Sequence, residues 1–180
     1  MTNFPYELPG TDDAYYLPAA EGPRVVSFDA LVTTKARKLE TGGDFSLIEM
    51  AGTQGTDAPP HSHAGEAEAF FILDGQVRVW VSDLEQLMNV GDFIRIPKGA
   101  PHKFRIESSF ARFLCFISPG GFEQFFGDLG ATTQKYLPPD RGEGGDFPTE
   151  ERLAEVAEKF DWHLEAEWDP ERRKQNSPDA

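Results

Sequence analysis

The sequence predicts an all-β fold, either a small β-barrel or a jelly roll, with a short helical C-terminal extension. Short segments rich in Val, Ile and Phe recur at near-regular spacing between residues 25 and 118, and turn residues separate them. No alternation of strand and helix patterns, which would indicate a parallel sheet, occurs there. Helical spacing of apolar residues begins only after Pro119, so helices are expected outside the barrel.

The barrel strands follow one another with clear turn signals. We expect strands over residues 24–28, 31–34, 45–50, 67–73, 77–81, 84–88, 92–96, 102–106 and 111–117. Asp74-Gly75 is a strong hairpin signal, which predicts that the strands on its two sides pair with each other and hold Glu68 in a hairpin. The expected organisation is one domain over residues 1–180, with the barrel at 25–118.

The two ends of the chain differ from the barrel. Residues 1–24 are rich in Pro and Gly and are expected to form an irregular arm on the barrel or on a second subunit. Residues 119–180 are expected to form the helical extension. Within it, residues 121–130 place phenylalanines at helical spacing, which predicts a face packed on the barrel, with a lid or a dimer contact as alternatives. Thr149 is the expected N-cap of a second helix, and His163 is expected to be a surface or packing residue.

The composition of the chain limits the classes of protein to which it can belong. The chain has 180 residues, enough for one domain with a sizeable core, and 39% of them are hydrophobic. The formal net charge of −14 argues against nucleic acid or an anionic membrane surface as a partner. The lone Cys115 excludes an internal disulfide, and its apolar surroundings predict a buried thiol. No leader-like segment or membrane span is evident, so a cytoplasmic protein is expected.

Residues 55–102 gather three of the 4 histidines and one well-spaced glutamate. Alternate side chains of a strand point to the same face, so His61 and His63 are expected to project together. Glu68 has the wrong parity to join them on one continuous strand, which predicts a bend or bulge between them. Imidazole and carboxylate groups together suit first-row divalent metals. These could instead be surface histidines of a proline-rich loop, but the combined spacing with His102 favours a metal site.

Two strings of residues around the histidines can be read as motifs. The first consists of Gly55, His61-Ser62-His63, Glu68 and Gly75, and the second of Gly91, Pro97-Lys98-Gly99 and His102. Together they resemble the paired motifs of the cupin superfamily. The pattern covers residues 55–106 and departs from the family at Ile106, where Asn is frequent, which bears on strand packing more than on metal binding. Beyond the barrel, the string Pro119-Gly120-Gly121-Phe122-Glu123-Gln124-Phe125-Phe126 is similar to the bacterial single-domain quercetin dioxygenases.

The resemblance implies a cupin barrel, also called a double-stranded β-helix, with one divalent metal ion per subunit held by His61, His63, Glu68 and His102. Such enzymes cleave the heterocyclic ring of a flavonol such as quercetin with O2. Glu68 would also act as the base that takes the proton of the flavonol 3-hydroxyl. The metal is expected to be Ni, Mn, Co, Fe or Cu. The expected partners are a small aromatic substrate, O2 and a second copy of the chain in a homodimer.

Three apolar residues are candidates for substrate contacts. Phe70 and Ile72 share a strand face with Glu68, and Phe104 shares one with His102. They are expected either to form a wall for a flat aromatic substrate or to belong only to the core. Two other functions stay open: a cupin with the same metal site and another chemistry, such as a different oxygenase or an isomerase, and a non-catalytic ligand-binding cupin. The complete set of ligands favours an enzyme.

Overall fold

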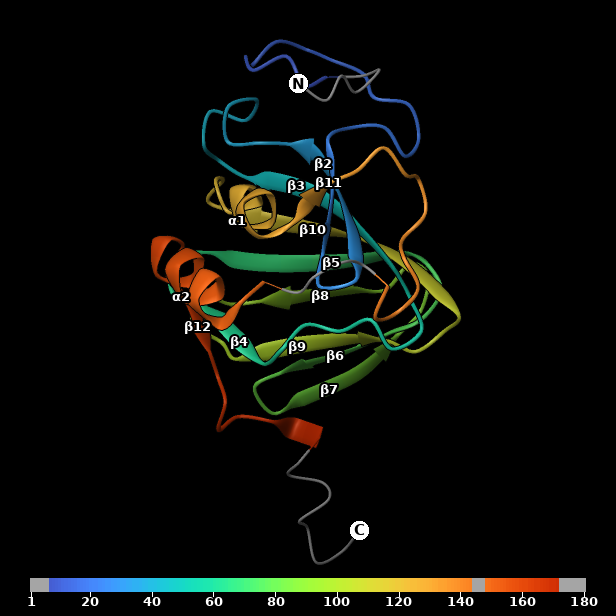
Figure 1. The fold of residues 1–180 in the computed structure, drawn as a ribbon, viewed down its shortest axis with the longest axis vertical. Coiled ribbons are helices and arrows are strands. Elements are labelled where there is room, and N and C mark those ends of the chain that lie inside the picture. Colours follow the sequence, from blue (N-terminus) through green and yellow to red (C-terminus); the bar gives the residue numbers. More distant parts are fainter. Residues whose placement is uncertain (1–6, 144–147, 172–180) are drawn as a thin grey trace, which may run out of the picture.

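The protein folds into two antiparallel β-sheets, as in a jelly roll (Figure 1). The computed structural model describes residues 7–143 and 148–171. One sheet contains, in spatial order, β11 (Ala131–Thr132), β1 (Arg24–Ser27), β2 (Ala30–Ala36), β3 (Ser46–Thr53), β10 (Phe110–Ser118), β5 (Ala67–Asp74) and β8 (Phe93–Ile96). The other contains β12 (Trp162–Leu164), β4 (His61–His63), β9 (His102–Ile106), β6 (Val77–Val81) and β7 (Leu84–Met88). The predicted all-β jelly roll is confirmed.

Side chains from both sheets fill the space between them. On β5, Phe70 and Ile72 are 3% and 0% exposed, whereas Phe71 between them is 42% exposed. This alternation follows from the pleat of a strand, which directs successive side chains to opposite faces. Val79 and Phe104 of the other sheet belong to the same hydrophobic cluster. One contiguous core therefore joins the two sheets.

The chain passes from one sheet to the other after β4, which carries His61 and His63, and before Glu68. β4 belongs to the five-stranded sheet, and β5, which begins at Ala67, belongs to the seven-stranded sheet. Residues 64–66 make the crossing. The bend that the parity of Glu68 predicted is therefore a change of sheet, and it lets side chains of both sheets point into one space.

The hairpin predicted at Asp74-Gly75 is wrong. β5 pairs with β10 and β8, and β6 pairs with β7 and β9, so this turn carries the chain from one sheet to the other. Gly75 has a φ of 72°, and a Cβ atom there would lie 2.1 Å from the carbonyl oxygen of Phe110. Glycine alone fits such a turn. Glu68 is thus held by the ladders of β5 with β8 and β10.

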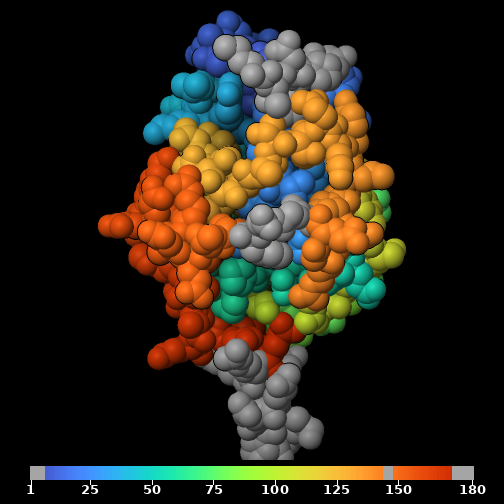
Figure 2. All heavy atoms as spheres, in the orientation of Figure 1, coloured from blue at the N-terminus to red at the C-terminus, as the bar shows by residue number. Residues whose placement is uncertain are grey.

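Two helices follow the barrel and pack on each other. They are α1 (Glu123–Leu129) and α2 (Glu150–Lys159). Phe122 and Phe125 are each 2% exposed and join the core, which confirms the packed face expected for this stretch. The side chain of Thr149 accepts a hydrogen bond from the backbone N–H of Arg152 at 3.2 Å, which confirms the predicted N-cap. Atoms of the residues that follow β10, coloured orange and red, occupy much of the face shown in Figure 2.

The described part of the N-terminal arm lies on the barrel without regular structure. The backbone N–H of Gly10 donates to Glu40 at 2.8 Å, and the hydroxyl of Tyr15 donates to the carbonyl oxygen of Lys35 at 2.6 Å. The expected packing of the arm on the barrel is seen for these residues, and residues 1–6 lie outside the described part. Neither helix of the described chain has the length and apolar character needed to cross a bilayer.

Candidate metal centre

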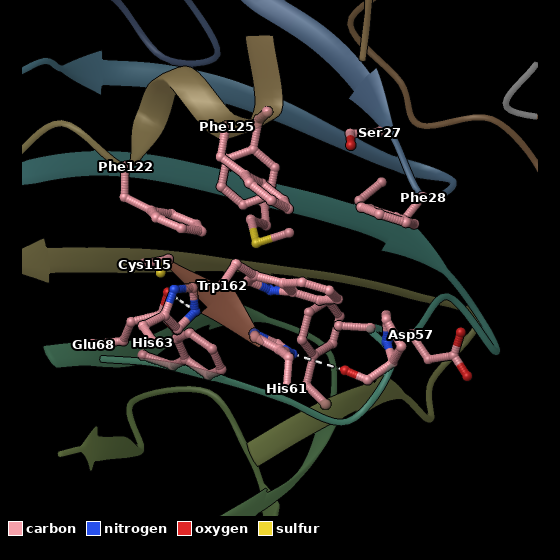
Figure 3. A pocket seen from close by; sticks show the side chains of 17 residues that line it. Ser27, Phe28, Asp57, His61, His63, Glu68, Cys115, Phe122, Phe125 and Trp162 are labelled. Atoms are coloured by element: carbon pink, nitrogen blue, oxygen red, sulfur yellow. Dashed lines mark hydrogen bonds and ion pairs between the residues drawn. The ribbon is translucent and has the colours of Figure 1, made fainter. Parts of the chain in front are cut away.

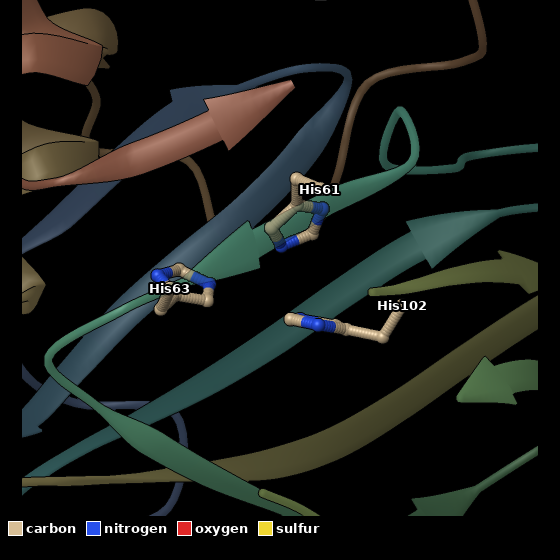
Figure 4. A group of neighbouring side chains, drawn as sticks. All are labelled: His61, His63 and His102. Carbon is tan, nitrogen blue, oxygen red and sulfur yellow. The ribbon is translucent and has the colours of Figure 1, made fainter. Parts of the chain in front are cut away.

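The four residues singled out by the motifs converge between the two sheets. His61 and His63 come from β4, His102 from β9 and Glu68 from β5. One ring nitrogen of each histidine lies within 4.8 Å of one nitrogen of each of the others, and the rings face a common centre (Figure 4). The carboxylate oxygens of Glu68 lie 3.4 Å from Nε2 of His63 and 3.3 Å from Nε2 of His102. All four side chains are buried.

The ring nitrogens have the orientation that a metal ion needs. Nδ1 of His61 lies 2.7 Å from the carbonyl oxygen of Pro59, and Nδ1 of His102 lies 3.0 Å from that of Ala100. Because a carbonyl only accepts, each Nδ1 carries a proton, and Nε2 is the nitrogen that offers a lone pair to a metal when the ring is neutral. Within the described chain no hydrogen bond satisfies Nε2 of His63 or of His102. Such buried nitrogens without partners are what a divalent cation would satisfy, so the donor set fits a metal.

Burial controls the charges of this site. It lowers the pKa of His61 well below the ordinary value, and the neighbouring His102 and His63 lower it further. Burial also lowers the pKa of His63, to about 4, although attraction to Glu68 opposes the change. Burial alone would raise the pKa of Glu68, but attraction to His63 and the interaction with His102 outweigh it, so the pKa is lowered. Near neutral pH, His61 and His63 are uncharged and Glu68 is ionised, as metal ligands must be.

The metal-free protein should lose stability in mild acid. His63 has a pKa of about 4 in the folded chain against 6.5 for an ordinary histidine. Between these values the unfolded chain binds more protons than the folded one, so the free energy of unfolding falls as the pH decreases. The contribution of His63 across this window is on the order of 3 kcal/mol. Urea titrations of the metal-free protein at a series of pH values within it would measure the slope.

Two variants control this measurement. His63→Gln should reduce the slope of the pH dependence without removing it, because His61, whose pKa is also lowered, still takes up a proton on unfolding. His163→Gln should keep the wild-type slope, because His163 is exposed on β12 and contacts Asp161. A His63→Gln protein that keeps the wild-type slope would contradict the account of this site.

An apolar pocket opens beside the histidines (Figure 3). Its walls are mainly aromatic, and they include Phe28, Phe70, Phe104, Phe122, Phe125 and Phe126. The free volume is about 40 Å³, which is room for only a few water molecules. Cys115 also lines it, and the predicted burial of this thiol is confirmed at 2% exposure. Burial, with a smaller effect of Glu68, raises the pKa of Cys115 well above its ordinary value, so the thiol is neutral.

The three apolar candidates for substrate contacts separate into two groups. Phe70 and Phe104 line the pocket, with their ring centroids 6.2 Å apart. Ile72 does not line it: this side chain is fully buried one pleat further along β5, where the strand has left the histidines and faces the core. Of the two roles expected for Ile72, its full burial favours the core, and contact with a substrate stays a prediction.

Sequence reasoning missed the aromatic residue that stacks on His61. Trp162 lines the pocket, and its ring stacks on that of His61 with centroids 5.3 Å apart and planes at 24°. It comes from β12, a strand that the sequence did not predict. The signal was present as Trp162-His163-Leu164 directly after a capped helix, but three residues are too few to show a strand period.

Comparisons with known proteins agree with this architecture. Residues 49–117 match the family described as Cupin domain. A quercetin 2,3-dioxygenase of Bacillus subtilis (strain 168) is 33% identical over 133 residues, which are 74% of this chain and 40% of that protein. A quercetin 2,3-dioxygenase of Aspergillus japonicus is 25% identical over 134 residues, covering 64% of this chain and 38% of that protein. The chain thus spans about 40% of the length of these curated relatives.

One solved structure shows the same fold. KdgF from Halomonas sp. superposes with a TM-score of 0.55 at 13% identity, and the match covers 62% of this chain and 98% of that one. At this identity the match reports the fold alone. Fold, family match and sequence relatives agree: the chain contains a cupin domain and resembles the quercetin 2,3-dioxygenases.

Proposed function

We propose that this chain is a metal-dependent dioxygenase that opens the heterocyclic ring of flavonols such as quercetin with O2. The observation that carries the proposal is the convergence of three buried histidines and a carboxylate, of which His61, His63 and Glu68 line an aromatic pocket. Similarity to two proteins named quercetin 2,3-dioxygenase supports the substrate class. Oxygen and a flat aromatic molecule are therefore the proposed substrates.

We assign His61, His63, Glu68 and His102 as the ligands of one divalent metal ion. Three imidazoles and one carboxylate accept Ni, Mn, Co, Fe or Cu, so the donor set alone does not select one of them. When bound, the ion would supply Lewis acidity toward a flavonol hydroxyl and a place for O2. The chain contributes the fixed positions of the ligands, which come from both sheets of a packed core.

Glu68 is the proposed general base. Its carboxyl is ionised, and burial excludes most of the water that would compete for a substrate proton. The proton of the flavonol 3-hydroxyl would pass to a carboxylate oxygen of Glu68, and the same residue could return it later in the reaction. Because the side chain is held between His63 and His102, a substrate that reaches the histidines also reaches the base.

The pocket walls would orient the substrate. Phe70 and Phe104 line the pocket and would contact a flat molecule, and Phe122 lies against His63 with ring centroids 4.2 Å apart. Since the free volume is only about 40 Å³, a flavonol can enter only if part of the wall moves. Phe28 and Phe126 are partly buried, whereas the other phenylalanines of the wall are buried, so these two are the side chains that we expect to move.

The test is anaerobic mixing of quercetin with protein loaded separately with each candidate metal, followed by admission of O2 while the flavonol absorption band is recorded. We expect a metal-dependent shift on binding and then O2-dependent bleaching. Metal-free protein and the His61→Ala variant are the controls, and neither should bleach the band. No shift with any metal would remove flavonols as substrates.

The small pocket favours a second candidate, a cupin of the same metal site acting on a smaller enolisable molecule. A substrate of one ring would need less movement of the walls than a flavonol of three rings. A shift of the quercetin band without bleaching would support this candidate, or a binding role without catalysis. The homodimer and the cytoplasmic location expected from the sequence stay predictions.

A further inference from the structure

The strand that carries two of the proposed ligands has neighbours on both sides. Among the described residues, β9 pairs with β4 at a single position, where His102 lies opposite His61. β12 pairs along the whole of β4, with Trp162 opposite His63 and Leu164 opposite His61 (Figure 1). The C-terminal strand therefore supplies most of the pairing that fixes the position of β4.

Polar contacts hold β12 against β4. Oγ of Ser62 donates to a carboxylate oxygen of Glu165 at 2.6 Å, and the backbone N–H of Glu165 donates to the carbonyl oxygen of Pro60 at 2.9 Å. Before β12 in the chain, α2 packs on the core through Val156, which is 2% exposed. The segment from α2 to Glu165 is thus anchored at both of its ends.

Trp162 is the residue of this segment that reaches the histidines. It lies between His61, at a centroid distance of 5.3 Å, and Phe125, at 5.8 Å (Figure 3). The indole ring is 6% exposed and nearly parallel to the imidazole of His61. An imidazole has a broad torsional preference about its Cβ–Cγ bond, so a stacked neighbour restricts the plane of the ring.

We propose that Trp162 is a positioning residue for the metal centre: stacking from β12 fixes the plane of His61 so that its Nε2 faces His63 and His102. The inference rests on the proposed metal site. Two contacts from outside the proposed ligand set hold the ring of His61, the bond of Nδ1 to the carbonyl of Pro59 and the stack on Trp162. The first fixes which nitrogen is free, and the second fixes where that nitrogen points.

Trp162 lies far along the chain from the residues of the cupin match. The cupin match ends at residue 117, and Trp162 lies beyond it on the C-terminal extension. The motifs therefore supply the ligands, while a strand that joins the same sheet from beyond the family match sets the orientation of one of them. A change in this segment would alter the metal centre without changing any ligand.

The test is Co²⁺ titration of the metal-free full chain, followed by the visible d–d spectrum, which reports the geometry around the ion. Trp162→Leu should weaken Co²⁺ binding about tenfold, the lower end of the range for outer-shell partners, and should change the spectrum. Trp162→Phe keeps an aromatic face and should restore the wild-type spectrum. Trp168→Leu is the matched control, because Trp168 is also buried on the extension but does not line the pocket.

Wild-type affinity and spectrum in Trp162→Leu would overturn the inference and leave the metal centre standing, and so would an equal loss in Trp168→Leu. Absence of Co²⁺ binding to the wild-type chain would overturn both the metal centre and the inference. If Trp162→Leu does not fold, Glu165→Ala takes its place, because it loosens β12 from β4 without entering the pocket. A changed Co²⁺ spectrum in Glu165→Ala supports the inference, and an unchanged one overturns it.

Discussion

His61→Ala should remove most of the metal from the protein and, with it, the proposed activity. His61 supplies one of three ring nitrogens that lie within 4.8 Å of one another, and alanine offers no donor in its place. Losing a direct ligand should weaken metal binding by more than about 100-fold, because replacing outer-shell partners alone costs up to that factor. Metal content after dialysis, measured by elemental analysis, checks the result.

His163→Ala is the matched control for this variant. His163 lies on β12 opposite Ser62, is exposed, and does not line the pocket. It should keep the wild-type metal content and activity. If His61→Ala retains as much metal as His163→Ala, His61 is not a ligand and the proposed centre is wrong.

Glu68→Gln should lose more activity than metal. Glutamine keeps an oxygen at nearly the same position, so part of the metal should be retained, but the amide cannot take up a proton. A positioned general base contributes about 100-fold to 10,000-fold to a rate, and turnover per bound metal should fall by a factor in that range. Quercetin turnover measured together with the metal content of the same sample gives this ratio.

Glu66→Gln serves as the control for Glu68→Gln. Glu66 is partly buried and lies just before β5, but it does not line the pocket. Turnover per bound metal should stay near the wild-type value in this variant. Equal turnover per bound metal in Glu68→Gln and wild type would exclude the base role, while leaving Glu68 available as a ligand.

The convergence of His61, His63 and Glu68 could be predicted because it depends on local spacing. In any strand, His61 and His63 point to the same face. Glu68 is an odd number of residues after His63, so a bend is needed between them if Glu68 is to join that face. The structure has this bend as a passage from one sheet to the other. The sequence could not specify which kind of bend, since both a bulge and a change of sheet restore the parity.

Long-range pairing is where sequence reasoning failed. Asp-Gly favours a tight turn, but a tight turn can join two sheets as well as two paired strands. Which of the two forms here depends on the strands with which β5 and β6 pair. The position of Trp162 beside His61 was missed for the same reason. Its place beside His61 depends on β12 joining β4 from far along the chain, and no local pattern encodes a pairing at that separation.

The pairing of β4 with β12 also bears on how the chain is made. All four proposed ligands leave the ribosome well before β12 does, because His102 precedes Trp162 in the sequence. A nascent or truncated chain that ends before Trp162 therefore has every ligand but leaves β4 as an unprotected edge strand. Open edges of this kind pair readily with other chains, so completion of the C-terminal segment protects the protein against aggregation through this edge.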